Sequence, residues 1–181
     1  MGLRGERQVV TKRYKEPDLL ANVDSIIKSA QEKGYYSGNS LDIERVIGDI
    51  SDIDVRYEQM DPNQSGSFKY ANNKWIIGVN KNHHPNRQKF TLAHELAHYV
   101  LHKEKNVEFV DTIFFRNNET DSTEYMANEF AAKLLMPEDK VRTLINQGIK
   151  NIGILAQEFG VSASAMKYRV ISLGYKMRDN V

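Results

Sequence analysis

The chain has 181 residues, of which 40% are hydrophobic and 27% are charged, and its formal net charge is +1 at pH 7. This length fits one domain with at most a small appendage, and the composition is typical of soluble globular proteins. A net charge near zero provides no general attraction to nucleic acids or anionic membranes. Because the chain contains no cysteine, disulfides and thiolate–metal sites are excluded, and any metal ligands must be His, Asp or Glu.

The N-terminal residues 1–15 are charged and show no periodicity, so we expect them to be flexible. They lack the apolar core of a signal peptide. No apolar run in the chain approaches the roughly 20 residues that a membrane span requires. We therefore expect a cytoplasmic protein without membrane contacts.

Hydrophobic periodicity predicts two helices followed by strands in the first half of the chain. The predicted elements are helices over 18–33 and 41–50, a strand over 53–58, and a hairpin of strands over 67–70 and 74–79. Gly34 is expected to end the first helix, and Asn39 or Ser40 to cap the second. The hairpin is expected to turn at Asn72-Asn73.

The second half of the chain is predicted to be mostly helical. The expected helices cover 87–102, 121–136 and 138–147, with two shorter helices within 151–173. The apolar segment 104–118 has no clear period and fits either a strand or an ordered loop. We divide the chain into the flexible residues 1–15, a domain over 16–148, and a C-terminal helical segment over 149–181 that packs on this domain.

A His-Glu-x-x-His motif lies within the predicted helix 87–102. In a helix, His94 and His98 project from one face and can hold one Zn²⁺ at about 2.0–2.1 Å. Glu95 lies about 100° around the helix, where it can take a proton from a water that the metal activates. The alternative interpretation is a pair of half-buried histidines on a core helix.

A catalytic zinc site normally has a third protein ligand. His102 lies about 12 Å along the helix from His94, which is too far for bonds of about 2 Å unless the helix bends. Glu124 lies on the apolar face of the predicted helix 121–136, where a metal would compensate its buried charge. It also fits a capping box with Asp121, so spacing alone leaves both roles open.

The chain closely resembles the ImmA/IrrE family of zinc metallo-endopeptidases in two segments, Asn86-Arg-Gln-Lys-Phe-Thr-Leu-Ala-His-Glu-Leu-Ala-His-Tyr-Val-Leu-His102 and Glu124-x-x-Ala-Asn-x-Phe-Ala-Ala-x-Leu-Leu-Met-Pro137. The resemblance implies that His94, His98 and Glu124 bind one zinc ion per chain. It also implies that Glu95 is the catalytic base. Members are bacterial or phage proteins, typically on mobile elements; some cleave a helix-turn-helix repressor, and others lie near toxin–antitoxin genes.

Several side chains near these segments are candidates for orienting the ligands or stabilising an oxyanion. They are Tyr99, His102, Tyr125 and Asn128. The sequence does not choose among them.

Residues 154–169 have the shape of a helix-turn-helix, with Gly160 at the turn and Ser162 as the cap of the second helix. Ser164, Lys167, Tyr168 and Arg169 would be the residues that read DNA. Basic residues are few in this region, so we expect it to pack on the domain. We assign no nucleic-acid-binding residue.

We therefore predict an α+β fold in which a small antiparallel or mixed sheet packs on the buried motif helix, next to a second ligand-bearing helix and the C-terminal segment. The predicted function is that of a zinc-dependent endopeptidase in a bacterial or phage regulatory system, which cleaves a repressor or an antitoxin. Residues 74–79 are expected at the sheet edge, where they would hold the substrate backbone. The alternatives are a non-catalytic metal-binding regulator of a repressor or of DNA, and a toxin-like component of a toxin–antitoxin pair.

Overall fold

The computed structural model describes residues 16–102 and 122–176, and it has a mixed α+β architecture. The helices are α1 (Glu16–Glu32), α2 (Ile43–Gly48), α3 (Pro85–His102), α4 (Ser122–Leu135), α5 (Glu138–Asn146), α6 (Ile152–Phe159) and α7 (Ala163–Ser172). The strands are β1 (Tyr36–Ser37), β2 (Ser40–Leu41), β3 (Ile53–Glu58), β4 (Gly66–Ala71) and β5 (Lys74–Asn80). The predicted fold class is confirmed. The predictions for 1–15 and 104–118 fall outside the described residues.

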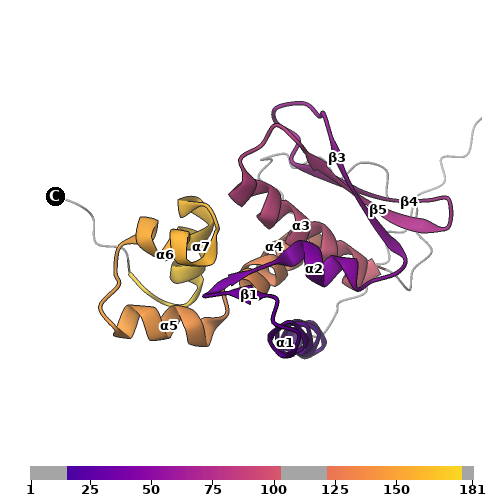
Figure 1. Ribbon diagram of the computed structural model, residues 1–181. Coiled ribbons are helices and arrows are strands. Elements are labelled where there is room, and N and C mark those ends of the chain that lie inside the picture. Colours follow the sequence, from indigo (N-terminus) through magenta and orange to yellow (C-terminus); the bar gives the residue numbers. More distant parts are fainter. Residues whose placement is uncertain (1–15, 103–121, 177–181) are drawn as a thin grey trace, which may run out of the picture.

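The larger sheet has the strand order β3-β5-β4 (Figure 1). β5 is parallel to β3 and antiparallel to β4, so the prediction that 74–79 forms an edge strand is wrong. The reason is burial: every residue of β5 except Lys74 is buried, as in a strand with neighbours on both sides. β4 instead exposes Lys69 and Tyr70, and it is an outer strand of the described sheet.

The hairpin of β4 and β5 turns at Asn72 and Asn73, as predicted. Both residues have positive φ, 54° and 60°. A two-residue type I′ loop requires positive φ at both central positions, and Asn tolerates this conformation better than most residues. The local sequence therefore determines the register of this pair.

A second, small hairpin was not predicted from the sequence. β1 and β2 pair antiparallel across Gly38, whose φ is 60°, so Ser40 lies in a strand and does not cap a helix. The cap of α2 is Asp42, whose side chain accepts a hydrogen bond from the Arg45 backbone N–H at 3.2 Å. The prediction of a cap at Asn39 or Ser40 is therefore wrong, because Asn39 lies in the turn between the two strands and Ser40 begins β2.

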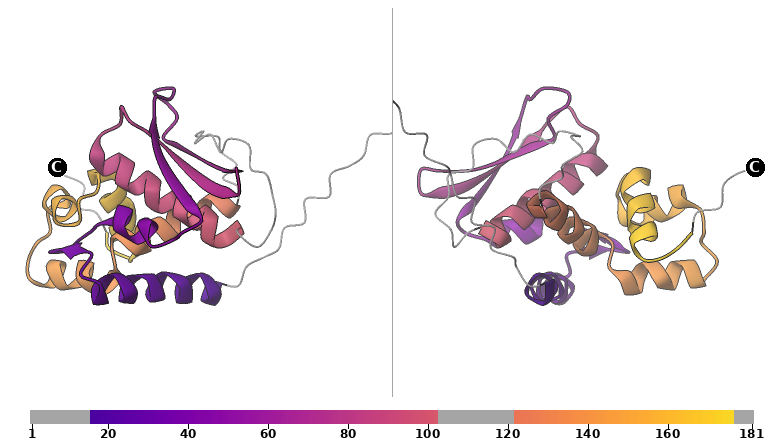
Figure 2. Two further views of the ribbon diagram at one scale, coloured as in Figure 1. Left: turned by 45° about the vertical axis from the view of Figure 1, so that its right-hand side comes forward. Right: turned by 180° about the vertical axis from the view of Figure 1, so that it is seen from behind.

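The larger sheet covers one side of α3, and α4 packs between α3 and α1 (Figures 1 and 2). Phe68 of β4 stacks on Trp75 of β5 with 4.6 Å between ring centroids, and its ring lies 6.3 Å from that of His98. Strand and helix side chains thus form one continuous core. None of the described helices combines the length and apolar character needed to cross a membrane.

The C-terminal helices α5, α6 and α7 lie together at one end of the molecule (Figure 1). Gly160 ends α6 in the left-handed conformation, and the Ser162 hydroxyl caps α7 by accepting from the Ala165 N–H at 3.1 Å. This is the helix-turn-helix shape that the sequence predicts. The proposed division of the chain after residue 148 stays a prediction.

Polar contacts attach these helices to the rest of the chain. Lys89 Nζ donates to the Phe159 carbonyl at 2.8 Å, and Asn86 Nδ2 donates to the Val161 carbonyl at 3.1 Å. The buried Arg169 donates through Nε to the Met136 carbonyl at 2.9 Å.

The two largest side chains among the four candidate DNA-reading residues both bond to other parts of the chain. Arg169 is buried on a main-chain carbonyl, and the Tyr168 hydroxyl donates to Glu129 of α4. Both contacts serve packing.

We expect Phe68→Ala to lower the free energy of unfolding of the metal-free protein by about 3–5 kcal/mol, because it removes a fully buried ring from the stack on Trp75. Lys69→Ala, at the exposed neighbouring position, should change it by less than about 0.5 kcal/mol. Urea unfolding followed by circular dichroism compares the two variants. If both variants lost the same free energy of unfolding, the stack of Phe68 on Trp75 would not be an important part of the core.

Candidate metal centre

The centre is built on α3, the most deeply buried helix segment near the sheet. Pro85 occupies its first position, and His84 Nδ1 accepts from the Asn86 N–H at 3.2 Å. All residues from 91 to 99 are buried, because the sheet covers one side of α3 and α4 packs against another. Such a helix holds polar side chains in fixed positions inside the core.

Three side chains from α3 and α4 bring their polar atoms together. The Nε2 atoms of His94 and His98 lie 3.0 Å apart. The Glu124 carboxylate lies 3.2 Å from His94 Nε2 through Oε2 and 3.3 Å from His98 Nε2 through Oε1. Tetrahedral zinc with bonds of about 2.0–2.1 Å needs neighbouring ligand atoms about 3.3 Å apart, so this donor set fits the ion.

The protonation states also suit a metal. Burial alone would raise the pKa of Glu124, but the hydrogen bonds from His94 and His98 are the main causes that outweigh it and lower the pKa to about 2. Burial lowers the pKa of His94, so its imidazole is neutral. An ionised carboxylate and a neutral imidazole are the forms that coordinate a cation.

Asn128 fixes the orientation of His94. Its Oδ1 lies 3.0 Å from His94 Nδ1, one helical turn after Glu124 on α4. An Nδ1–H that donates to this oxygen leaves the lone pair on Nε2, which faces the other two ligand atoms. Of the two roles that the sequence leaves open for Asn128, this contact favours orienting a ligand.

Glu95 is the unusual member of the group. It is fully buried, and neither carboxylate oxygen has a hydrogen-bond partner among the described residues. Burial, with the charge of Glu124 as a second cause, raises the pKa of Glu95 well above its usual range. An unpartnered buried carboxylate is costly, which is typical of a functional group.

Gly66 lets β4 approach this carboxylate closely. A Cβ built on Gly66 would lie 2.9 Å from Glu95 Oε1 and 2.5 Å from Thr91 Cγ2. Sequence reasoning did not assign this glycine a role in the site. The available signals are a glycine in a predicted loop before a strand, which is weak by itself, and the extension of the family resemblance to Ser65-Gly66.

The remaining candidate residues lie differently. The Tyr99 hydroxyl donates to both oxygens of Asp52, at 2.8 and 3.0 Å, so its proton is held by a carboxylate before β3. Tyr125 follows Glu124 on α4 and is 56% exposed, and it stays a candidate for stabilising an oxyanion. The side chain of His102 and the capping partner Asp121 are outside the described part of the chain.

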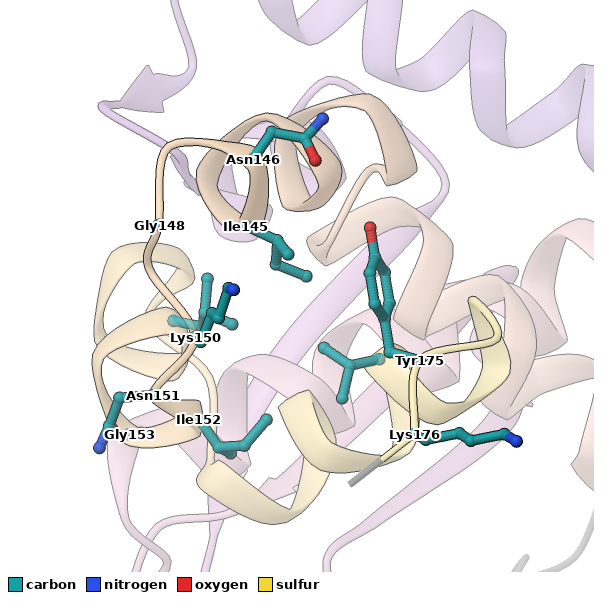
Figure 3. Close-up of a pocket in the computed structure, with 11 residues that line it drawn as sticks. Ile145, Asn146, Gly148, Lys150, Asn151, Ile152, Gly153, Tyr175 and Lys176 are labelled. Carbon is teal, nitrogen blue, oxygen red and sulfur yellow. The ribbon is translucent and has the colours of Figure 1, made fainter. Parts of the chain in front are cut away.

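A cavity of about 980 Å³ lies elsewhere, among the C-terminal helices. Ile145, Ile152 and Tyr175 turn toward one another around it, whereas Lys176 points away (Figure 3). None of the convergent His and Glu side chains lines this cavity. The candidate centre is therefore identified by its donor atoms and not by cavity size.

Comparisons with known proteins relate the chain to a metallopeptidase family. The family model Peptidase_M78, described as the IrrE N-terminal-like domain, matches residues 49–170. The chain is 31% identical over 121 residues to uncharacterized immunity region protein 2 of Bacillus phage phi105, a match that covers 63% of this chain and 70% of the phage protein.

A solved structure of a Mycobacterium tuberculosis transcriptional regulator is also similar, with a TM-score of 0.58 and 19% sequence identity. This match covers 85% of the chain but only 46% of the regulator, so the chain spans less than half of that protein's length. At this identity the likeness concerns the fold alone.

We expect Asn128→Ala to weaken metal affinity by about 10–100-fold, because His94 loses the acceptor that sets its tautomer and ring orientation. Asn128→Asp keeps an acceptor oxygen at this position and should retain the affinity. Titration against a chromophoric chelator measures both variants. Unchanged affinity in Asn128→Ala would show that this hydrogen bond does not orient the ligand.

Proposed function

The chain belongs to the Peptidase_M78 family, the ImmA/IrrE-like metallopeptidases, and we propose that it is a zinc-dependent endopeptidase of a phage or bacterial regulatory system. The observation that carries the proposal is the convergence of His94, His98 and Glu124 beside the buried carboxylate of Glu95. A site that served only to hold a metal would not need this additional carboxylate.

In the proposed enzyme, the Nε2 atoms of His94 and His98 and the carboxylate of Glu124 hold one zinc ion. When bound, zinc acts as a Lewis acid that polarises the scissile carbonyl and lowers the pKa of water. Asn128 keeps His94 in the ligating tautomer through the hydrogen bond at Nδ1.

Glu95 moves the proton. A cation held by His94, His98 and Glu124 would offset the burial and negative charge that raise the pKa of Glu95, so that its carboxylate is ionised. The carboxylate then accepts a proton from the water that attacks the scissile carbonyl carbon, and it donates this proton to the leaving amide nitrogen. The C–N bond breaks and the carboxylate returns to its starting state. Neither oxygen of Glu95 has a hydrogen-bond partner among the described residues, so both oxygens are available for this proton transfer.

We propose that the substrate backbone adds to β4 rather than to β5. β4 is an outer strand of the described sheet, and its first residue, Gly66, lies beside Glu95. An extended peptide that pairs with an outer strand is held by main-chain hydrogen bonds along its length. A substrate in this position would lie near Glu95 of α3.

The proposed substrate is a helix-turn-helix repressor or an antitoxin, as the resemblance to the family implies. The phage relative is named for an immunity region, which supports a role in phage regulation. A non-catalytic regulator that binds a repressor or DNA, or a toxin-like protein, is the alternative. The buried Glu95 argues against the non-catalytic regulator, because a structural metal site requires no base.

Protein purified without added metal should contain about one zinc per chain, and Glu124→Ala should contain little or none, because it removes one of three ligands. Glu129→Ala, which removes another carboxylate of α4, is the matched control and should keep the metal. Elemental analysis measures all three proteins. Full zinc in Glu124→Ala would assign the third ligand elsewhere, and no zinc uptake by wild type would refute the proposal.

Glu95→Gln should keep the fold and the zinc but lower the rate of peptide-bond cleavage by about 10²–10⁴-fold, because the amide cannot accept the proton. The assay incubates zinc-loaded protein with a helix-turn-helix repressor from the same phage or host system, and mass spectrometry identifies the fragments. Equal cleavage by wild type and Glu95→Gln would exclude Glu95 as the base.

A further inference from the structure

Arg87, in the first turn of α3, reaches the residue that precedes β4. Its Nε and Nη2 donate to the Ser65 hydroxyl oxygen at 3.0 and 2.8 Å. A guanidinium has five N–H donors, so the Nη1 and Nη2 fork keeps donors for a carboxylate. Arg87 is exposed, and it forms no ion pair with any residue in 16–102 or 122–176.

Arg87 also lies on the same side of α3 as Glu95. Arg87, Thr91 and Glu95 follow one another at intervals of four residues, and Thr91 and Glu95 both border Gly66 at the start of β4. Eight helical residues span about 12 Å, which an extended peptide covers in about three to four residues. A substrate strand along β4 would therefore present one side chain to Arg87, at a fixed distance from the scissile bond.

The chain around this position contains no acidic residue. Between Asp61 and Glu95 there is no Asp or Glu, whereas there are five basic residues: Lys69, Lys74, Lys81, Arg87 and Lys89. Lys74 pairs with Asp54, and Lys89 is held by the Ser40 hydroxyl and the Phe159 carbonyl. The Asp61 side chain accepts from the Asn63 N–H within its own loop. The charge of Arg87 is therefore not neutralised by the chain that surrounds it in sequence.

We propose that Arg87 determines specificity by binding the carboxylate of an Asp or Glu side chain in the substrate, about three to four residues from the scissile bond. The proposal rests on the proposed peptidase function and names the chemistry of the segment that it cleaves. Ser65 fixes the guanidinium through one edge, and the other edge meets the carboxylate in a charge-assisted pair.

The test uses zinc-loaded Glu95→Gln protein to select binders from a display library of random linear peptides. We expect the selected peptides to share an Asp or Glu at one position, and we expect Glu95→Gln/Arg87→Glu protein to select Lys or Arg there instead. A synthetic pair of one selected peptide, with Glu or Gln at that position, then measures affinity by fluorescence anisotropy. The Glu peptide should bind about 10-fold more tightly, and adding Arg87→Gln should abolish the difference.

Two control variants separate recognition from folding. Lys81→Gln removes an equal charge from the same acid-free stretch, and it should keep the preference for Glu. Ser65→Ala removes the anchor but not the charge, so it should weaken the preference without abolishing it. Thermal unfolding of each variant checks that the fold is intact.

No shared acidic position, or an unchanged preference for Glu in Arg87→Gln, would overturn the inference. Binding of a random DNA duplex that depends on Arg87 and displaces the peptides would also overturn it, because phosphate would then be the ligand. Incubation of the selected peptides with zinc-loaded wild type tests the enzyme separately. Peptides that bind through Arg87 but are never cleaved would refute the peptidase function and leave the recognition by Arg87 standing.

Discussion

The structure depends on the contact between α3 and α4, which places ionisable side chains inside an apolar core. Two imidazoles and one carboxylate meet there at 3.0–3.3 Å, and each compensates the burial of the others. The fully buried alanines of α4, Ala127, Ala131 and Ala132, allow the two helices to approach closely enough for this contact. Glu95 has no such compensation, because both of its carboxylate oxygens are buried without a hydrogen-bond partner among the described residues.

The sheet supports this contact from the other side of α3. Phe68 fills the space between Trp75 and His98, and Gly66 brings the backbone of β4 to the carboxylate of Glu95. The same strand that closes the core therefore also forms a wall of the candidate site. A side chain at position 66 would push β4 away from Glu95 and Thr91, so the packing of the core and the shape of the candidate site both require glycine there.

Local signals in the sequence were sufficient for most helices and for the hairpin at Asn72-Asn73, because periodicity, caps and turns act over a few residues. They were insufficient where distant segments decide. The order of the three strands depends on the direct pairing of β3 with β5, although β4 lies between them in the sequence. No local pattern encodes this pairing. Spacing on α4 likewise left Glu124 between a capping and a ligand role, and only its distances to His94 and His98 from α3 favour the latter.

The hydrogen bonds to the C-terminal helices limit how far the chain can be truncated from its C-terminal end. Lys89 and Asn86, on the helix that carries the histidines, bond to the turn after α6, and Arg169 of α7 bonds to the Met136 carbonyl. Excising everything beyond residue 148 would remove the acceptor of the Asn86 amide, one of the two acceptors of Lys89 and the donor to the Met136 carbonyl. It would also uncover the apolar surface that α6 and α7 bury in the common core. We therefore expect a fragment truncated at this point to be aggregation-prone, and the shortest useful expression fragment to include α7.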